Sequence, residues 1–186
     1  SDTVNVPVTV KDVTGPTITA ESATVTKNTP ITPIPVTAVD NTGGVGMRDN
    51  NPIQVSNLPQ GLKYENGQIT GTTNAKTGYY TVKITAYDKN NTPSTKSIRI
   101  TVQDQASKYN PTGDSLTVNQ GQPITDEAVK AKVKNYAPGT LTVESKPTST
   151  ATAGNAGNAV VKVTYPDGSS DTVNVPVTVK DVTGPT

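Results

Sequence analysis

Valine and polar residues alternate over two neighbouring stretches near the C-terminus. Val161, Val163 and Tyr165 alternate with polar residues, and the alternation resumes from Val173 to Val179 after a Pro-Asp-Gly segment. Alternation with a period of two is typical of half-buried strands, because successive side chains point to opposite faces. Proline presets φ and glycine accepts a positive φ, so the segment between the stretches favours a turn. The pattern predicts a β-hairpin over residues 160–180.

The second arm of this hairpin is present twice in the chain. Ser1–Thr17 is identical to Ser170–Thr186, and we interpret the shift of 169 residues (170 minus 1) as the repeat length of a longer protein. Residues 1–16 are then the C-terminal strand and linker of a preceding repeat, and residues 182–186 are the linker to the next one. Residues 1–11 lack their hairpin partner, so we expect them to be disordered or to pair with a neighbouring sheet edge.

Residues 17–104 contain about seven short segments with strand-like alternation, separated by turns rich in Gly, Pro and Asn. The first segment is Ile18–Thr26, where a change of parity near Glu21 predicts a β-bulge. Many short strands at regular spacing are typical of an all-β sandwich. An odd number of strands would also place the two ends of the chain at opposite ends of this domain.

Prolines inside the predicted strands carry positional information, because proline cannot donate a ladder hydrogen bond. Pro176 lies on the face opposite the valines and predicts that its strand is at a sheet edge. Pro33 and Pro35 likewise predict an edge position or an irregular start for the strand around Val36.

Residues 105–181 combine short strands with one helical signal. Thr125 can cap a helix, and two acidic residues that follow it suit the positive end of a helix. Apolar residues at helical spacing extend this predicted helix over about two turns to Val133. Residues 104–111 read as a linker. The sequence pattern therefore predicts a mostly β fold of two tandem domains, 17–104 and 105–181, the second with a short helix.

Composition limits the cores and the chemistry. Hydrophobic residues make up 31% of the chain, with seven Tyr and no Phe or Trp, so the cores must be small and built mainly from aliphatic residues. The absence of His and Cys excludes disulfides, thiolate metal sites and Ser-His-Asp or Cys-His catalysis. Catalysis by a pair of carboxylates stays open as an alternative, but we expect no enzyme. The net charge of +1 gives no electrostatic reason to expect nucleic acid as a partner. No apolar run approaches the ~20 residues of a membrane span, so no membrane insertion is expected.

Residues 17–104 carry glycine turns followed by alternating strands in a specific order. The residues in this order are Leu58-Pro59-Gln60-Gly61-Leu62, Gly67-Gln68-Ile69-Thr70-Gly71-Thr72, Gly78-Tyr79-Tyr80-Thr81-Val82 and Ala86-Tyr87-Asp88. With these residues, the segment resembles the immunoglobulin-like or cadherin-like modules of bacterial surface proteins.

The predicted hairpin carries a specific run of residues: Val163-Thr164-Tyr165-Pro166-Asp167-Gly168-Ser169, Asp171-Thr172-Val173 and Val175-Pro176-Val177-Thr178-Val179. With these residues, 105–181 resembles the Rib/alpha-like repeat of Gram-positive cell-wall-anchored surface proteins. This resemblance implies a small immunoglobulin-like β domain in an extracellular tandem repeat, anchored to the cell wall of a Gram-positive bacterium. The two resemblances together imply two tandem immunoglobulin-like β-sandwich domains arranged end to end. We expect a structural stalk unit of a surface adhesin, which contributes to adhesion or biofilm and has neighbouring repeats of the same chain, a host surface or a neighbouring cell as partners. The alternative is that the first domain binds a host glycan or protein.

Acidic and amide side chains follow several predicted strands and could bind calcium, which takes six to eight oxygen ligands from flexible loops. The cadherin-like resemblance favours this hypothesis, because such modules use loop and linker acids. The alternative is that these side chains form Asx turns with their own backbone. The candidate ligands are Asp40, Asn41, Asp49, Asp88, Asn90 and Asp104, with Asp12 at a second domain junction.

Two further hypotheses concern tyrosines and lysines. Tyr64, Tyr79 and Tyr87 could stack on a sugar, or they could simply pack across strands on a sheet surface. An intramolecular Lys–Asn isopeptide bond would need a buried lysine beside an acid, but Lys83 and Lys162 fall on the polar faces of their strands.

Overall fold

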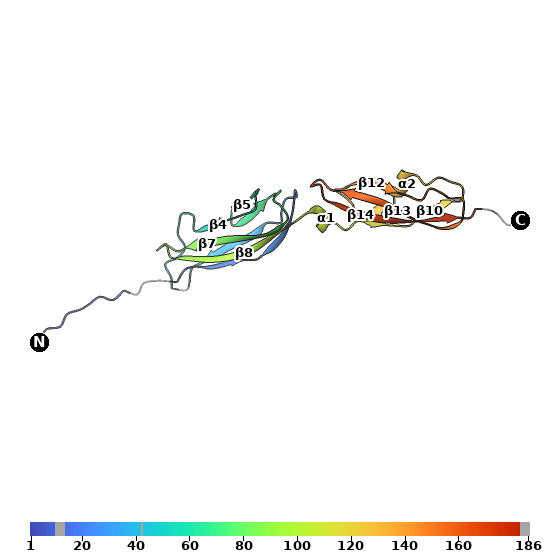
Figure 1. Cartoon of the computed structure of the whole chain (residues 1–186). Helices are drawn as coiled ribbons and strands as arrows, with labels where there is room; N and C mark the ends of the chain where they lie inside the picture. Colours follow the sequence, from blue (N-terminus) through green and yellow to red (C-terminus); the bar gives the residue numbers. More distant parts are fainter. Residues whose placement is uncertain (10–13, 42, 183–186) are drawn as a thin grey trace. The chain divides into compact units, whose positions relative to one another are not determined.

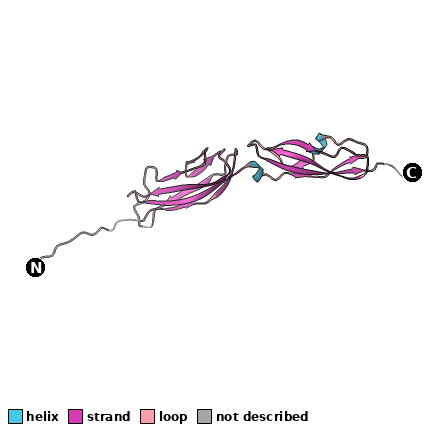
Figure 2. Cartoon of the chain, viewed as in Figure 1, coloured by secondary structure: helices cyan, strands magenta, loops and turns pink. Residues whose placement is uncertain are grey.

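A computed structural model describes residues 1–9, 14–41 and 43–182 of the chain. The described chain forms two compact units, each considered by itself below. The first holds Thr29–Val102 and most of the chain before it, and the second holds Thr26–Asn28 and the chain from Gln103 onward. Strands make up most of both units, with two short helices in the second (Figure 2). Within the described residues, no helix is long and apolar enough to cross a membrane.

The first unit is a sandwich of two four-stranded sheets (Figure 1). One sheet has the order β1 (Thr17–Ala20), β3 (Ile34–Val39), β6 (Gln68–Gly71) and β5 (Leu62–Glu65). The other has the order β2 (Ala23–Thr26), β8 (Pro93–Gln103), β7 (Gly78–Tyr87) and β4 (Ile53–Ser56). The alternation predicted for the two long strands is confirmed, because Val82, Ile84 and Ile100 are fully buried between the sheets.

The segment Ile18–Thr26 is two strands rather than the single bulged strand that its parity change predicts. β1 pairs with β3 in one sheet, whereas β2 lies beside β8 in the other. The chain crosses between the sheets at Glu21–Ser22, where the Ser22 Oγ accepts a hydrogen bond of 2.9 Å from the Arg99 N–H. The alternation of buried and exposed side chains shifts by one residue here, because β1 and β2 face the core from opposite sheets. The described part of this unit therefore has eight strands instead of seven.

β3 is not the edge strand that Pro33 and Pro35 predict, because it lies between β1 and β6. Pro35 pairs only with Gln68 of β6, and the ladder with β1 begins one residue later at Val36. Pro35, which has no N–H, thus lies just before the ladder with β1 begins, so no hydrogen bond of that ladder is lost.

The second unit has one four-stranded sheet, covered on its inner face by smaller elements. The sheet has the order β10 (Leu116–Asn119), β14 (Ser170–Lys180), β13 (Gly154–Thr164) and β12 (Thr140–Ser145). The other elements are a two-stranded ribbon of β9 (Thr112–Gly113) and β11 (Val133–Lys134), and the helices α1 (Gln105–Lys108) and α2 (Asp126–Lys130). The core contains residues from both layers, including Val129 of α2 and Val133 of β11.

The predicted hairpin is confirmed: β13 and β14 pair antiparallel from Thr164 with Ser170 to Gly154 with Val179, with one register shift between Asn155 and Gly157. Val175 and Val177 are fully buried, as the alternation requires. The edge position inferred from Pro176 is wrong, because β14 lies between β13 and β10. The ladder between β14 and β10 begins at Val177, so Pro176 precedes this ladder instead of interrupting it.

The predicted helix start is confirmed, but the helix is shorter than its apolar spacing indicates. The Thr125 Oγ1 accepts a hydrogen bond from the Ala128 N–H, as a capping residue should. α2 ends at Lys130, and the chain continues into β11, where Val133 pairs with Gly113. Val133 reaches the core from a strand, so pairing with β9 overrides the helical pattern.

Residues 104–111, read as a linker, contain the helix α1. The Asp104 side chain caps it by accepting from the Ser107 N–H. The helix is attached to the hairpin turn, since the Gln105 N–H donates to the Asp167 Oδ2 at 2.8 Å and the Asp167 N–H donates to the Gln105 Oε1 at 3.1 Å. Burial alone would raise the pKa of the Asp167 carboxyl, but hydrogen bonds from Ser169 and from the Gln105 N–H outweigh it, so the pKa is lowered.

The N-terminal copy of the β14 sequence forms no strand over residues 1–9. Val4, Val6 and Val8 are 80%, 76% and 85% exposed, whereas the matching valines of β14 are 5% exposed or less. Residues 10–13, which include Asp12, and residues 183–186 of the linker predicted at 182–186 lie outside the described residues. The same residues therefore bury their valines only where β13 and β10 flank them.

We expect Asp167→Asn to lower the free energy of unfolding of the second unit by about 1–2 kcal/mol at neutral pH, because a charged acceptor of several hydrogen bonds is lost. The lowered pKa of Asp167 means that its contribution is present above its unfolded pKa of about 3.9 and is lost as the pH falls through the folded pKa. Urea unfolding between neutral and acidic pH measures both effects.

Asp126→Asn is the matched control. The pKa of the Asp126 carboxyl is also lowered, by a hydrogen bond from Lys146, but this pair is exposed to solvent. It should change the stability little at any pH. Identical pH profiles of the wild-type protein and Asp167→Asn would contradict the role given to Asp167.

Candidate functional site

Two of the predicted calcium ligands, Asp40 and Asn41, lie side by side after β3. The Asp40 Oδ2 accepts a hydrogen bond of 2.7 Å from the Gly46 N–H. With its amide oriented so that the nitrogen can donate, Asn41 bonds to the Asp40 Oδ1 at 2.8 Å and to the Thr14 carbonyl at 3.1 Å. Asp40 thus closes its own loop, and Asn41 connects Asp40 to the chain that leads into β1.

Asp88 is fully buried at the end of β7. Its Oδ1 accepts hydrogen bonds from the backbone N–H groups of Asn90 at 2.8 Å and Thr92 at 2.9 Å, which is the Asx-turn arrangement of the alternative hypothesis. Its Oδ2 has no hydrogen-bond partner among the described residues. A buried carboxylate oxygen without a donor is costly, so this atom fits a position that a cation would stabilise.

The loops that carry Asp40 and Asp88 meet at Gly46. Its N–H bonds to Asp40, and its carbonyl accepts from the Lys89 N–H at 2.9 Å. Met47 also forms an isolated antiparallel bridge with Asp88. The fold therefore brings four of the predicted ligands to neighbouring loops, namely Asp40, Asn41, Asp88 and Asn90. Among the described residues, no three acidic side chains gather in a way that could hold a metal ion.

Asp49 and Asp104, the other two predicted ligands, have different surroundings. Asp104 caps α1 in the second unit. Asp49 lines a hollow of about 560 Å³. The residues that line the hollow are Arg48, Asp49, Asn50, Asn51 and Lys89. Two cationic side chains share this hollow with one carboxylate, so its charge favours an anionic or polar ligand over a metal ion.

Arg48 is held rigidly at the hollow, a feature that the sequence pattern did not indicate. Its Nε and Nη2 donate to the carbonyls of Asn50 and Asn51, both at 2.8 Å, and its Nη1 donates to the Asn91 Oδ1 at 3.3 Å. The guanidinium also lies 4.0 Å from the centre of the Tyr87 ring. Within the described part of the chain, these contacts use three of its five N–H donors, so two are open to a ligand.

The three tyrosines proposed for sugar stacking are each engaged within the first unit. The Tyr64 hydroxyl donates to the Val36 carbonyl at 3.1 Å, and burial raises the pKa of Tyr64. Tyr79 is 72% exposed, but the Arg99 guanidinium from β8 lies 4.4 Å from its ring centre. Tyr87 stacks under Arg48. Arginine thus covers one face of two rings, which fits the alternative of packing across the sheet surface.

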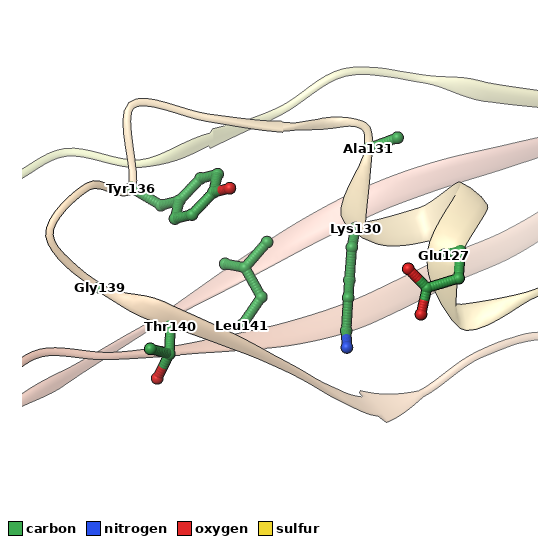
Figure 3. Close-up of a pocket in the computed structure, with 7 residues that line it drawn as sticks. All are labelled: Glu127, Lys130, Ala131, Tyr136, Gly139, Thr140 and Leu141. Carbon is green, nitrogen blue, oxygen red and sulfur yellow. The ribbon is translucent and has the colours of Figure 1, made fainter.

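A groove in the second unit lies between α2 and the start of β12 (Figure 3). Tyr136 and Leu141 face the same space in this view, and Lys130 extends from α2 toward β12. The residues that line the groove are Glu127, Lys130, Ala131, Tyr136, Gly139, Thr140 and Leu141. The charged groups at this groove are Glu127, which is exposed, and Lys130, which is half-buried.

The chain enters and leaves the first unit at opposite ends of β8. Gly15 packs so closely against the start of β8 that a Cβ on it would lie 2.3 Å from the Ser94 Oγ. The chain leaves at Gln103, where β8 ends. β8 has 11 residues, which at about 3.3 Å per residue span roughly 33 Å.

The second unit has the same arrangement about β14. The chain enters at α1, which is bonded to the turn that precedes β14, and leaves after Lys180 at the far end of this strand. β14 also has 11 residues and spans roughly 33 Å. Within this unit, Figure 1 shows α1 and the C-terminal end of β14 at opposite ends.

Comparison with known families assigns both units. Residues 105–181 match the Rib domain family, a range that runs from α1 to the end of β14. The second unit is a Rib domain. The chain before it, residues 15–103, matches the family described as "Putative Ig domain". The Rib domain thus begins with α1 and ends with the duplicated strand sequence.

The C protein alpha-antigen of Streptococcus agalactiae is 38% identical over 84 residues, which cover 44% of this chain and 8% of that protein. A Rib domain structure from Streptococcus pyogenes is 34% identical, with a TM-score of 0.33, over 40% of this chain and 95% of that one. The human desmocollin-1 ectodomain is 13% identical, with a TM-score of 0.39, over 90% of this chain and 42% of that one.

Proposed function

We propose that this chain is a repeat unit of a Gram-positive cell-surface protein, anchored elsewhere in that protein to the cell wall. Its role is that of a structural spacer, which holds a binding region away from the wall and so contributes to adhesion or biofilm. The Rib domain match and the likeness to the C protein alpha-antigen support membership of such a repeat protein. Its partners are then the neighbouring repeats of the same chain.

One observation carries the spacer role: each unit is entered at one end of its last strand and left at the other. Each unit therefore separates the chain that precedes it from the chain that follows it by roughly 33 Å. A unit whose connections lay at the same end would add residues without adding reach.

The duplicated segment extends this reasoning to an array of units. Ser1–Thr17 repeats the sequence of β14 and of the residues that follow it. In a longer chain it would be the last strand of a preceding Rib domain. Successive units would then follow one another through short linkers, and the reach would grow with the number of copies, as in other repeat proteins.

We expect spin labels at Thr95→Cys and Lys180→Cys to lie roughly 60 Å apart or more, because two strand lengths of about 33 Å separate these exposed positions in an end-to-end arrangement. The chain has no native Cys, so the labels attach at unique positions. Pulsed electron paramagnetic resonance measures the distance. Labels at Ser170→Cys and Lys180→Cys, at the two ends of β14, calibrate the measurement. A distance well below 60 Å would mean that the units fold back on each other, and the spacer role would fail.

We also propose a calcium site where the loops that carry Asp40 and Asp88 meet at Gly46. The buried Asp88 Oδ2 without a partner supports this proposal, and Asp40, Asn41 and nearby carbonyls are the other oxygen donors at these loops. A bound cation would give the buried Asp88 Oδ2 the positively charged partner that it lacks. It would also link the two loops at the end where the chain enters the first unit.

Excess calcium should raise the melting temperature of the first unit relative to EDTA, because a ligand of the folded state alone stabilises it by mass action. Asp88→Asn should abolish this shift. Glu65→Gln, in an exposed pair with Lys63 on β5, is the control and should preserve it. Equal melting temperatures of the wild-type protein in calcium and in EDTA would remove the calcium proposal.

The alternative function is binding of a host ligand by the first unit, and the hollow beside Arg48 favours it. Two unused N–H donors of Arg48 and the Lys89 ammonium suit the carboxylate of an acidic saccharide. Titration with a sialylated trisaccharide should then give a saturable Kd in the micromolar range, lost in Lys89→Gln, whereas lactose should not bind. Absence of saturable binding would leave the spacer role alone.

A further inference from the structure

We propose that both units are built to resist force applied through their two ends, because in each the last strand is paired in parallel with an early strand. This inference rests on the proposed spacer function, in which a pulled array transmits tension from one unit to the next. The orientation of the terminal strands decides how a unit yields to that tension.

In the Rib domain the terminal pair is β10 and β14. The two strands are parallel over four residue pairs, from Leu116 with Val177 to Asn119 with Lys180. The pairing continues one residue further, since the Gln120 N–H donates to the Lys180 carbonyl at 2.8 Å. On its other side, β14 is paired with β13 from Ser170 to Val179. β14 therefore cannot leave the sheet without breaking ladders on two sides.

Tension acts on this pair in shear. It pulls β10 from its N-terminal end at Leu116 and β14 from its C-terminal end at Lys180. Because the strands are parallel, these forces are opposite and run along the strand axes, so the hydrogen bonds of the ladder are loaded together. Two strands pulled apart from the same end would instead lose these bonds one at a time, and the net contribution of a single backbone hydrogen bond is small.

The residues that precede β10 add a second attachment in the path of the force. α1 is bonded to the hairpin turn through Gln105 and Asp167, and the Ala106 N–H donates to the Ser169 Oγ at 3.0 Å. Gly113 of β9 packs so closely on β14 that a Cβ on it would lie 2.2 Å from the Asn174 carbonyl oxygen. Tension from the N-terminal side must release these contacts before it reaches the whole length of β10.

The first unit repeats the arrangement with an unrelated sequence. β2 and β8 are neighbours in one sheet. The Arg99 N–H donates to the Ser22 Oγ at 2.9 Å, and the Gln103 Nε2 donates to the Thr26 Oγ1 at 3.1 Å, both between residues 77 positions apart. A constant separation along two strands means that they run in the same direction. Both units thus present a parallel terminal pair to tension.

The test pulls the Rib domain of the full-length chain in two directions by single-molecule force spectroscopy. Handles at Ser115→Cys and Lys180→Cys load β10 and β14 in shear, whereas handles at Gln122→Cys and Lys180→Cys pull both strands from the same end. All three positions are exposed, and the chain has no other Cys. We expect the unfolding force in the first geometry to be at least about twofold higher, because four residue pairs break together.

Urea unfolding of the two double variants is the control and should give equal free energies, so that any difference in force reflects direction alone. Equal unfolding forces in the two geometries would overturn the proposal. The measurement concerns one unit, so it is independent of the distance between units. A short distance between Thr95 and Lys180 would end the spacer role and leave the force ratio standing, whereas a direction-independent force would leave the spacer role intact.

Discussion

Burial of the valine face of β14 is the interaction on which the Rib domain depends. The chain has no Phe or Trp, so this core is assembled from small side chains that must each be fully enclosed. Val175 and Val177 are completely buried, and full burial of one such side chain contributes about 1.5–3 kcal/mol. β14 lies in the interior of its sheet, so its loss would expose both β13 and β10. The identical residues at the N-terminus, without such neighbours, expose their valines to solvent.

The position of β14 also links stability to the proposed function. The strand is at once the centre of the core, the exit of the chain from the unit and the parallel partner of β10. Asp167 belongs to the turn that precedes it and attaches α1, where the chain enters. The same strand therefore spans the full length between the two connections. In the first unit β8 has the same position, with Gly15 packed at its beginning and Gln103 at its end.

Local sequence patterns predicted the strands and the helix start, because alternation and capping depend on residues close together in the chain. They did not predict which strands are neighbours in a sheet. The alternation around Val163 and Val175 identified the hairpin, and Thr125 identified the start of α2, since a cap is a local hydrogen bond. The change of parity near Glu21 was visible, but a bulge and a change of sheet produce the same pattern. Pro176 was placed at an edge because the sequence does not show that the β10 ladder begins one residue later.

Among the candidate site residues, the sequence could select Asp40 and Asp88 by their position after strands, but not their different surroundings. Asp88 is buried, and its Oδ2 lacks a partner, where two loops meet at Gly46. Arg48 is held in place by its hydrogen bonds to Asn50, Asn51 and Asn91. The sequence by itself determined the strand-rich character, the two-part organisation and the valine-lined hairpin, because these follow from side-chain periodicity and turn chemistry. Only the tertiary structure decided which strands are neighbours, that the terminal strands run parallel, and that α1 is fastened to the hairpin turn. These features depend on contacts between residues far apart in the chain, which no local pattern encodes.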